Sequence, residues 1–256
     1  MRLLASPLDD TATEPVPSTI SFAVPAETSA PLVTPLALAF RSRWPDVTLD
    51  IREGNGADLE EWLLHRHVDL AILQDPPSLP DIEITPLLTE SLGLVAPVHS
   101  HLVADTRPAS LRELVGESLI LPGPQHWIRR RLEIAAQQSG MRLNMVLQVN
   151  STALAKVMVR SGLGCTILPR SFVQDDIARG ALAFRPIGQP HLTCTRAIAF
   201  HRAASNTLVP AFAEMACDAM ATLAENGVWP DAQMIRPGTR THSHAAWRTA
   251  EEAAIR

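Results

Sequence analysis

The stretch that decides the fold is TISFAVPAETSAPLVTPLALAFRSRWPDVTLDIREGNGADLEEWLLHRHVDLAIL, residues 19–73. Its apolar residues switch between the helical period of about 3.6 residues and the alternating or continuous patterns of strands. In chain order the pattern predicts a strand over 19–24, a helix over 29–43, a strand over 47–52, a helix over 57–67 and a strand over 69–73. This alternation predicts a parallel sheet with helices on its faces.

A second α/β set follows residue 97. Its predicted strands are 118–121, 144–149, 165–168, 181–187 and 193–200, and its predicted helices are 124–139, 151–161, 171–179 and 206–225. Pro124 suits the first turn of its helix, and Ser151 suits the cap of the next. Two such sets predict two lobes joined by two crossings, with a cleft between them where ligands tend to bind.

The predicted boundaries follow from this division. Lobe I comprises 18–96 plus 191–225, lobe II comprises 97–190, and the crossings lie near 95–98 and 188–192. Residues 1–17 are rich in Pro, Thr and Asp, which is linker composition typical of a disordered segment, and 226–256 read as a tail.

The charge balance argues against direct DNA binding by this chain. The net charge is -5, the isoelectric point is about 6.0, and Lys156 is its single lysine. Arg129, Arg130 and Arg131 form the one local basic cluster, which is too short for a phosphate-binding stripe. We therefore expect contact with DNA only through another domain.

Other function classes lack their motifs. Cys165, Cys194 and Cys217 are far apart and odd in number, so they predict neither disulfides nor a zinc site. His242 and His244 lack a third metal ligand in the sequence, and no Walker, HExxH or GxSxG motif occurs. We therefore expect that the protein binds no metal, uses no cofactor and is not an enzyme. The absence of a secretory signal or a long apolar run predicts a cytoplasmic protein.

Three motifs together resemble the effector-binding region of LysR-type transcription regulators. They are FRSRWPDVTLDIREGNGADLEEWLLHRHVDLAIL (40–73), LPGPQHWIRRRLE (121–133) and NSTALAKVMVRSGLGCTILP (150–169). The resemblance covers about 18–225. It implies a type-2 periplasmic-binding-protein fold, a small polar metabolite as effector, regulation of transcription, and homodimers or higher homo-oligomers.

The resemblance is incomplete at the N-terminus. Family members begin with a winged helix-turn-helix and a linker helix, and this sequence carries neither. MRLLASPL would be the last turn of that linker helix, and either a misplaced start codon or a truncated gene would explain the difference. The alternative functions are a solute-binding protein or an enzyme on the same fold.

Three predicted strand-to-helix junctions, 25–29, 122–126 and 150–153, are the candidate ligand contacts. Free N–H groups at helix N-termini favour anions and other hydrogen-bond acceptors, and the resemblance places effector contacts in the same loops. The candidate residues are Thr28, Ser29, Gln125, His126, Asn150, Ser151 and Thr152. The alternative is that Thr28, Ser29 and Ser151 only cap helices.

Two further features set expectations for selectivity and assembly. Glu27 stands where the family usually has Ser or Thr, so it either faces solvent or shifts selectivity towards amines and amino acids. Leu32, Leu36 and Phe40 form a stripe on the first predicted helix that is usually core. The resemblance implies that this helix packs against lobe II of a partner chain in a homodimer.

Overall fold

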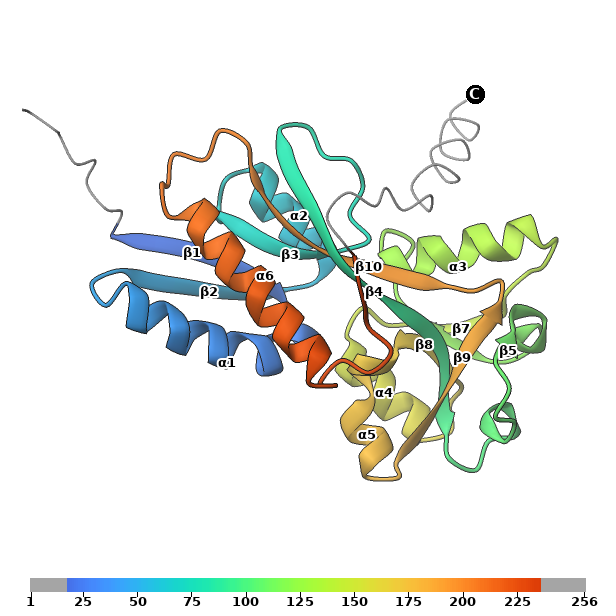
Figure 1. Ribbon diagram of the computed structural model, residues 1–256. Coiled ribbons are helices and arrows are strands. Elements are labelled where there is room, and N and C mark those ends of the chain that lie inside the picture. Colours follow the sequence, from blue (N-terminus) through green and yellow to red (C-terminus); the bar gives the residue numbers. More distant parts are fainter. Residues whose placement is uncertain (1–17, 236–256) are drawn as a thin grey trace, which may run out of the picture.

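The computed structural model describes residues 18–235, apart from the side chains of Ser29 and Ala30, as two lobes joined by two crossings (Figure 1). The strands are β1 (Thr19–Pro25), β2 (Thr48–Gly54), β3 (Leu70–Gln74), β4 (Ile82–Pro97), β5 (Ala109–Ser110), β6 (Leu119–Leu121), β7 (Met145–Gln148), β8 (Thr166–Pro169), β9 (Leu182–Gln189), β10 (Thr193–His201) and β11 (Gln233–Met234). The α-helices are α1 (Ala26–Arg43), α2 (Gly56–Leu64), α3 (Trp127–Gln138), α4 (Thr152–Arg160), α5 (Gln174–Ala178) and α6 (Val209–Glu225). Short 3-10 turns are η1 (His101–Val103), η2 (Leu111–Leu114) and η3 (Arg170–Phe172).

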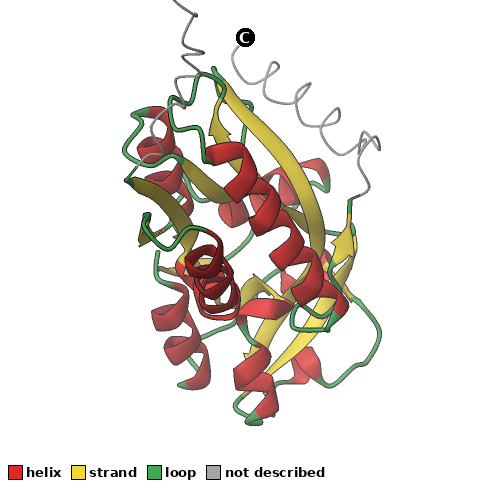
Figure 2. Cartoon of the chain, turned by 60° about the vertical axis from the view of Figure 1, so that its left-hand side comes forward, coloured by secondary structure: helices red, strands yellow, loops and turns green. Residues whose placement is uncertain are grey.

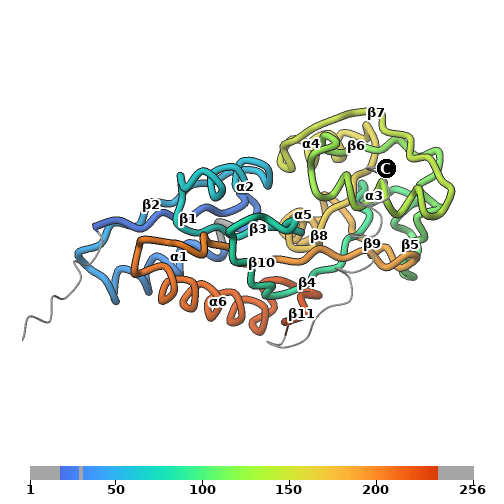
Figure 3. Tube along the Cα trace, turned by 90° about the horizontal axis from the view of Figure 1, so that it is seen from above, coloured from blue at the N-terminus to red at the C-terminus, as the bar shows by residue number. Residues whose placement is uncertain are grey.

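Lobe I is the parallel sheet that the opening stretch predicts. Strands β2, β1 and β3 pair in parallel, and β10 and β4 extend the sheet in the antiparallel sense. Helices α1 and α6 cover one face and α2 covers the other (Figure 3). Phe212 of α6 makes edge-on ring contacts with Phe22 and Phe40, at 5.3 and 5.4 Å between centroids, which ties both helices to the sheet.

Strand β4 passes through both lobes, and it is a strand that the sequence analysis does not predict. Its first part pairs with β10 as far as Ser91, and from Leu92 it pairs with β8 and β9. The change of partner therefore comes earlier in the chain than the expected crossing near 95–98. The return crossing, between the end of β9 at Gln189 and the start of β10 at Thr193, coincides with the expected region.

Lobe II is more irregular than lobe I. Strands β6 and β7 form a separate parallel pair, and an isolated bridge joins Leu119 of β6 to Cys165, the residue before β8. Figure 2 shows the helices and strands of the chain coloured by type. Its core packs Trp127, Ile128 and Leu132 of α3 against these strands. The helix expected over 171–179 is instead the turn η3 followed by the short α5.

Two other boundaries differ from the prediction. Helix α3 begins at Trp127, because residues before it form a turn in which His126 N–H donates to the carbonyl of Gly123 at 3.0 Å. Pro124 therefore lies before the first helical turn. The packed structure also continues beyond 225, since Trp229 is buried and β11 pairs with β4. The expectations for 1–17, His242 and His244 lie outside the described residues.

The apolar stripe on α1 is fully used within its own lobe. Leu32, Leu36 and Phe40 are at most 1% exposed in the lobe I core, so they are not available to a partner chain. The large apolar residue that α1 does expose is Leu38, at 69%. Among the described helices, none combines the length and hydropathy that crossing a bilayer requires.

Candidate functional site

A cavity of about 630 Å³ opens between the two lobes. Lobe I contributes the first turn of α1 and the end of β2, and lobe II contributes the first turns of α4 together with η3 and the start of α5. Trp229, from the segment after α6, closes one side. The cavity is large enough for a small metabolite.

The N-terminus of α4 presents unused donors to this cavity. Ser151 caps the helix, and its hydroxyl accepts from Leu154 N–H at 3.3 Å. Among residues 18–235 the backbone N–H groups of Thr152 and Ala153 have no hydrogen-bond partner, and both residues line the cavity. These N–H groups favour a carboxylate or another hydrogen-bond acceptor.

The charged side chains around the cavity are unevenly paired. Lys156 donates to the carbonyl of Phe172 at 2.9 Å and forms an ion pair with Asp176 at 2.8 Å, a carboxylate that it shares with Arg160. Glu27 and Asp175 also line the cavity, and within the described part of the chain neither carboxylate has an ion pair. The wall therefore offers acceptors for an amino group as well as donors for an acid.

A second cavity of about 260 Å³ continues the same cleft. Asn55 and Asn150 line both cavities, so the two are adjacent along the space between the lobes. The side-chain oxygen of Asn150 accepts from Gly123 N–H at 2.9 Å, which holds the loops after β6 and β7 together. A Cβ atom on Gly123 would lie 3.3 Å from Asn150 Oδ1, so this close approach favours glycine.

His126 lines the second cavity and caps α3. Its Nδ1 accepts from Ile128 N–H at 3.2 Å, which requires an unprotonated ring nitrogen. Burial, together with the nearby Arg130 charge, lowers the pKa of His126 to about 4. The pKa of Glu60 in the same cavity is raised by burial, and Arg130 opposes this shift in part.

Thr28 occupies a different environment from the other candidates. It is fully buried, and its hydroxyl accepts from Nη1 of Arg196. Arg196, also fully buried, donates to Glu90 at 2.5 Å and to Ser171 at 2.9 Å. Its guanidinium thus connects α1 of lobe I to η3 of lobe II.

The structure brings most of the predicted site residues to the cleft. Gln125, His126 and Asn150 line the second cavity, and Asn150, Ser151 and Thr152 line the first. Thr28 is not among the residues lining either cavity, and the side chain of Ser29 lies outside the described part.

The sequence analysis did not assign several residues of this region to the site, among them Asn55, Lys156, Arg196 and Trp229. Asn55 had a detectable signal, because Asn55 and Asp58 have the spacing of a capping box, which the structure confirms. Lys156 was identified as the single lysine but was not assigned to the site. Arg196 and Trp229 have no local signal, since their partners are distant in sequence.

The two lobes, two crossings and intervening cleft define an effector-binding domain of the type-2 periplasmic-binding-protein class. The family model for the LysR substrate binding domain matches residues 14–221, and the chain belongs to that family. The fold and family that the three motifs predicted are therefore confirmed.

Similar proteins support the same assignment. BbuR, an HTH-type transcriptional regulator of Bordetella bronchiseptica, is 29% identical over 216 residues, which cover 84% of this chain and 66% of BbuR. The transcriptional activator CmpR of Synechocystis is 30% identical over 129 residues, covering 50% of this chain and 42% of CmpR. The chain thus spans about two thirds of BbuR and less than half of CmpR.

Solved structures show the fold independently. The regulatory domain of NMB2055 (MetR), a LysR family regulator from N. meningitidis, matches with a TM-score of 0.66 and 20% identity, covering 85% of this chain and 98% of that domain. The effector-binding domain of QuiR in complex with shikimate matches with a TM-score of 0.70 and 19% identity, covering 78% of this chain and 95% of that domain.

Proposed function

We propose that a small polar metabolite binds in the cleft and that the complete regulator changes transcription in response. The observation that carries this proposal is the 630 Å³ cavity lined by both lobes and by the unpaired N–H groups of Thr152 and Ala153. A ligand that contacts both lobes favours their closure, because it binds the closed arrangement more tightly than the open one. In this proposal the protein acts in the cytoplasm and is not an enzyme, as expected of a transcription regulator, and reaches DNA through a separate DNA-binding domain.

The cavity favours a ligand that carries both an acid and an amino group. The first turn of α4 would bind the acid, and the carboxylates of Glu27 and Asp175 would accept from the amino group. Amino acids and close derivatives fit this pattern. An effector that is only anionic would meet repulsion from both carboxylates.

A ligand from this class is expected to raise the melting temperature by about 5–10 °C at a hundredfold excess over Kd. The measurement is a thermal shift assay with a panel of amino acids and the matching α-hydroxy acids. Ser151 lines the cavity, and in this proposal its hydroxyl donates to the acid. In Ser151→Ala the ligand-induced shift should therefore fall by about 2–4 °C, because that hydrogen bond, worth ~1 kcal/mol, is lost.

Ser110→Ala is the matched control. Ser110 also caps a helix, η2, where its hydroxyl accepts from Arg112 N–H at 3.3 Å, but it lines neither cavity of the cleft. Both variants should lower the melting temperature without ligand, and only Ser151→Ala should reduce the ligand-induced shift. Equal shifts in both variants and the parent would contradict this assignment, and larger shifts with the hydroxy acids would contradict the role of the amino group.

We also predict that the chain forms a homodimer in which α1 packs against lobe II of the partner chain. The support is the exposure of Leu38 on α1 and of Val146, Leu154 and Val157 on lobe II. Leu38→Glu should raise the dimer dissociation constant ~10-fold or more, since two apolar side chains lose burial per dimer. Light scattering as a function of protein concentration measures this dissociation constant.

Leu64→Glu on α2 is the control, because it also replaces an exposed leucine, and it should leave the dimer unchanged. A parent protein that is monomeric at micromolar concentration would refute the prediction.

A further inference from the structure

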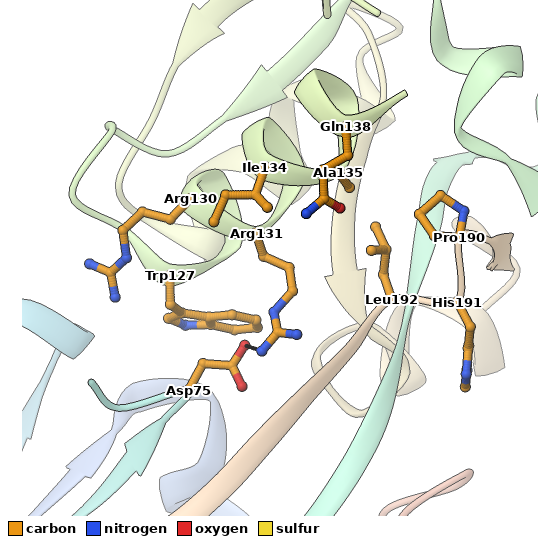
Figure 4. A pocket seen from close by; sticks show the side chains of 10 residues that line it. All are labelled: Asp75, Trp127, Arg130, Arg131, Ile134, Ala135, Gln138, Pro190, His191 and Leu192. Carbon is orange, nitrogen blue, oxygen red and sulfur yellow. Dashed lines mark ion pairs between the residues drawn. The ribbon is translucent and has the colours of Figure 1, made fainter. Parts of the chain in front are cut away.

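A third cavity, of about 250 Å³, lies beside α3 at the crossing between the lobes (Figure 4). Asp75, at the end of β3, contributes the lobe I side, and α3 contributes the lobe II side. Residues 190–192 of the return crossing form a third wall. The cavity shares only Trp127 and Arg130 with the second cavity of the cleft.

The cavity combines a cationic group with apolar walls. The ring of Trp127 and the side chains of Ile134, Ala135 and Leu192 supply apolar surface (Figure 4). Arg131 extends from α3 towards Asp75, with 2.6 Å between Nη2 and Oδ2, while Arg130 points away from it (Figure 4). Asp75 balances the charge of Arg131, so an anion would bind here through N–H groups of Arg131 that the ion pair leaves unused.

Arg131 retains donors for such an anion. Its side chain is 24% exposed, and among residues 18–235 its contact with Asp75 is the single polar contact of its guanidinium. A guanidinium has five N–H groups in a planar fork that suits a carboxylate. Several N–H groups therefore remain for a ligand.

The walls are held in place before any ligand binds. Trp127 Nε1 donates to Gln74 Oε1 at 3.0 Å, and Asp75 Oδ1 accepts from Thr195 N–H at 2.8 Å. Both contacts are buried. A cavity with fixed walls loses little conformational entropy when it is filled, which favours binding.

We propose that this cavity is a second ligand site, separate from the cleft, which takes a small monocarboxylate with a flat or branched apolar body. The carboxylate would pair with the free N–H groups of Arg131, and the apolar body would lie against Trp127, Ile134 and Leu192. The volume restricts the site to compact ligands, because it lies just below the usual range for drug-sized molecules. Since both lobes contact the ligand, its binding is coupled to their relative position.

Isothermal titration of the full chain with phenylacetate tests the proposal, and phenylacetamide is the uncharged comparison. Phenylacetate should bind, and phenylacetamide should bind at least ~10-fold more weakly, because a charge-assisted hydrogen bond is lost. Arg131→Gln should weaken phenylacetate binding by a similar factor. Arg129→Gln, on the same helix but paired with Glu133 outside the cavity, should leave binding within about twofold.

Asp75→Asn separates ligand binding from a purely structural role of the ion pair. Asparagine keeps an acceptor for Thr195 and tolerates the positive φ of 45° at this position. It also removes the carboxylate that competes for Arg131, so phenylacetate should bind several-fold more tightly. If the pair only stabilised the lobes, Asp75→Asn and Arg131→Gln would weaken binding alike.

The outcomes against the proposal are distinct. No saturable binding of phenylacetate, equal binding of phenylacetamide, or equal loss in Arg131→Gln and Arg129→Gln would each overturn it. If Arg131→Gln fails to fold by circular dichroism, the Asp75→Asn result decides, and unchanged or weaker binding rejects the site. Loss of binding in Ser151→Ala would place phenylacetate in the cleft instead, which also overturns the proposal without affecting the function proposed for the cleft.

Discussion

Arg196→Met is expected to lower the free energy of unfolding by about 3–5 kcal/mol, as removal of one partner from a buried ion pair usually does. Glu90, which is 1% exposed, would lose its 2.5 Å pairing with Arg196 and remain as an uncompensated buried charge. The packing of the guanidinium between Phe172 and Trp229, at 5.3 and 5.0 Å from the ring centroids, would also change. Chemical denaturation at neutral pH measures the loss.

Two comparisons isolate the buried charge as the cause. The double variant Glu90→Leu with Arg196→Met should recover most of the stability, because two apolar side chains replace both charges. Arg52→Met removes an arginine whose ion pair with Asp50 is exposed on β2, and it should cost less than about 1 kcal/mol. Equal losses in Arg196→Met and Arg52→Met would show that the buried pair has no special role.

The second large effect that we expect is a loss of folding stability at acidic pH, and protonation of His126 is its source. The folded pKa of about 4 lies below the ordinary value of 6.5, so the unfolded chain takes up the proton first as the pH falls. The contribution to stability is therefore complete above pH 6.5 and is lost progressively towards pH 4. The loss from this residue amounts to about 3 kcal/mol at most.

His126→Asn provides the control for this pH dependence. Asparagine is a favourable cap for α3 and does not titrate. Denaturant unfolding between pH 7 and pH 4 should show a steeper loss of stability in the parent than in the variant. The raised pKa of Glu60 acts in the opposite direction in both proteins, so the difference between them reports on His126. Parallel pH profiles would rule out protonation of His126 as the cause.

The sequence predicts lobe I better than lobe II, for a physical reason. Strands β1 and β3 are buried and continuous, and the helices between them repeat with a clear period, so local pattern and tertiary packing agree. Strand β4 alternates irregularly between buried and exposed positions and contains Pro86, because its neighbours change along its length. A local pattern cannot represent a strand that serves two sheets.

The residues of the candidate site likewise divide into those that a local sequence pattern predicts and those that it does not. The caps at Ser151 and His126 belong to local junctions, and both were named from residues adjacent in sequence. Arg196 lies within a buried strand, where an apolar residue is the ordinary expectation, and its partner Glu90 belongs to another strand. Only the fold brings these two charges together, so sequence reasoning alone could not find them.

The long strand β4 and its partner β10 also determine the order in which the two lobes can finish folding while the chain is being synthesised. Within the described residues, the pairing partners of β8, of β9 and of the second half of β4 all lie between residues 92 and 189. The strand pairing of lobe II therefore forms from one continuous piece of chain. Lobe I begins with the first strands to emerge, yet Ala71 of β3 must wait for Ala199 of β10, and Phe22 must wait for Phe212. Since synthesis proceeds from the N-terminus, the lobe that is started first is the one that is finished last.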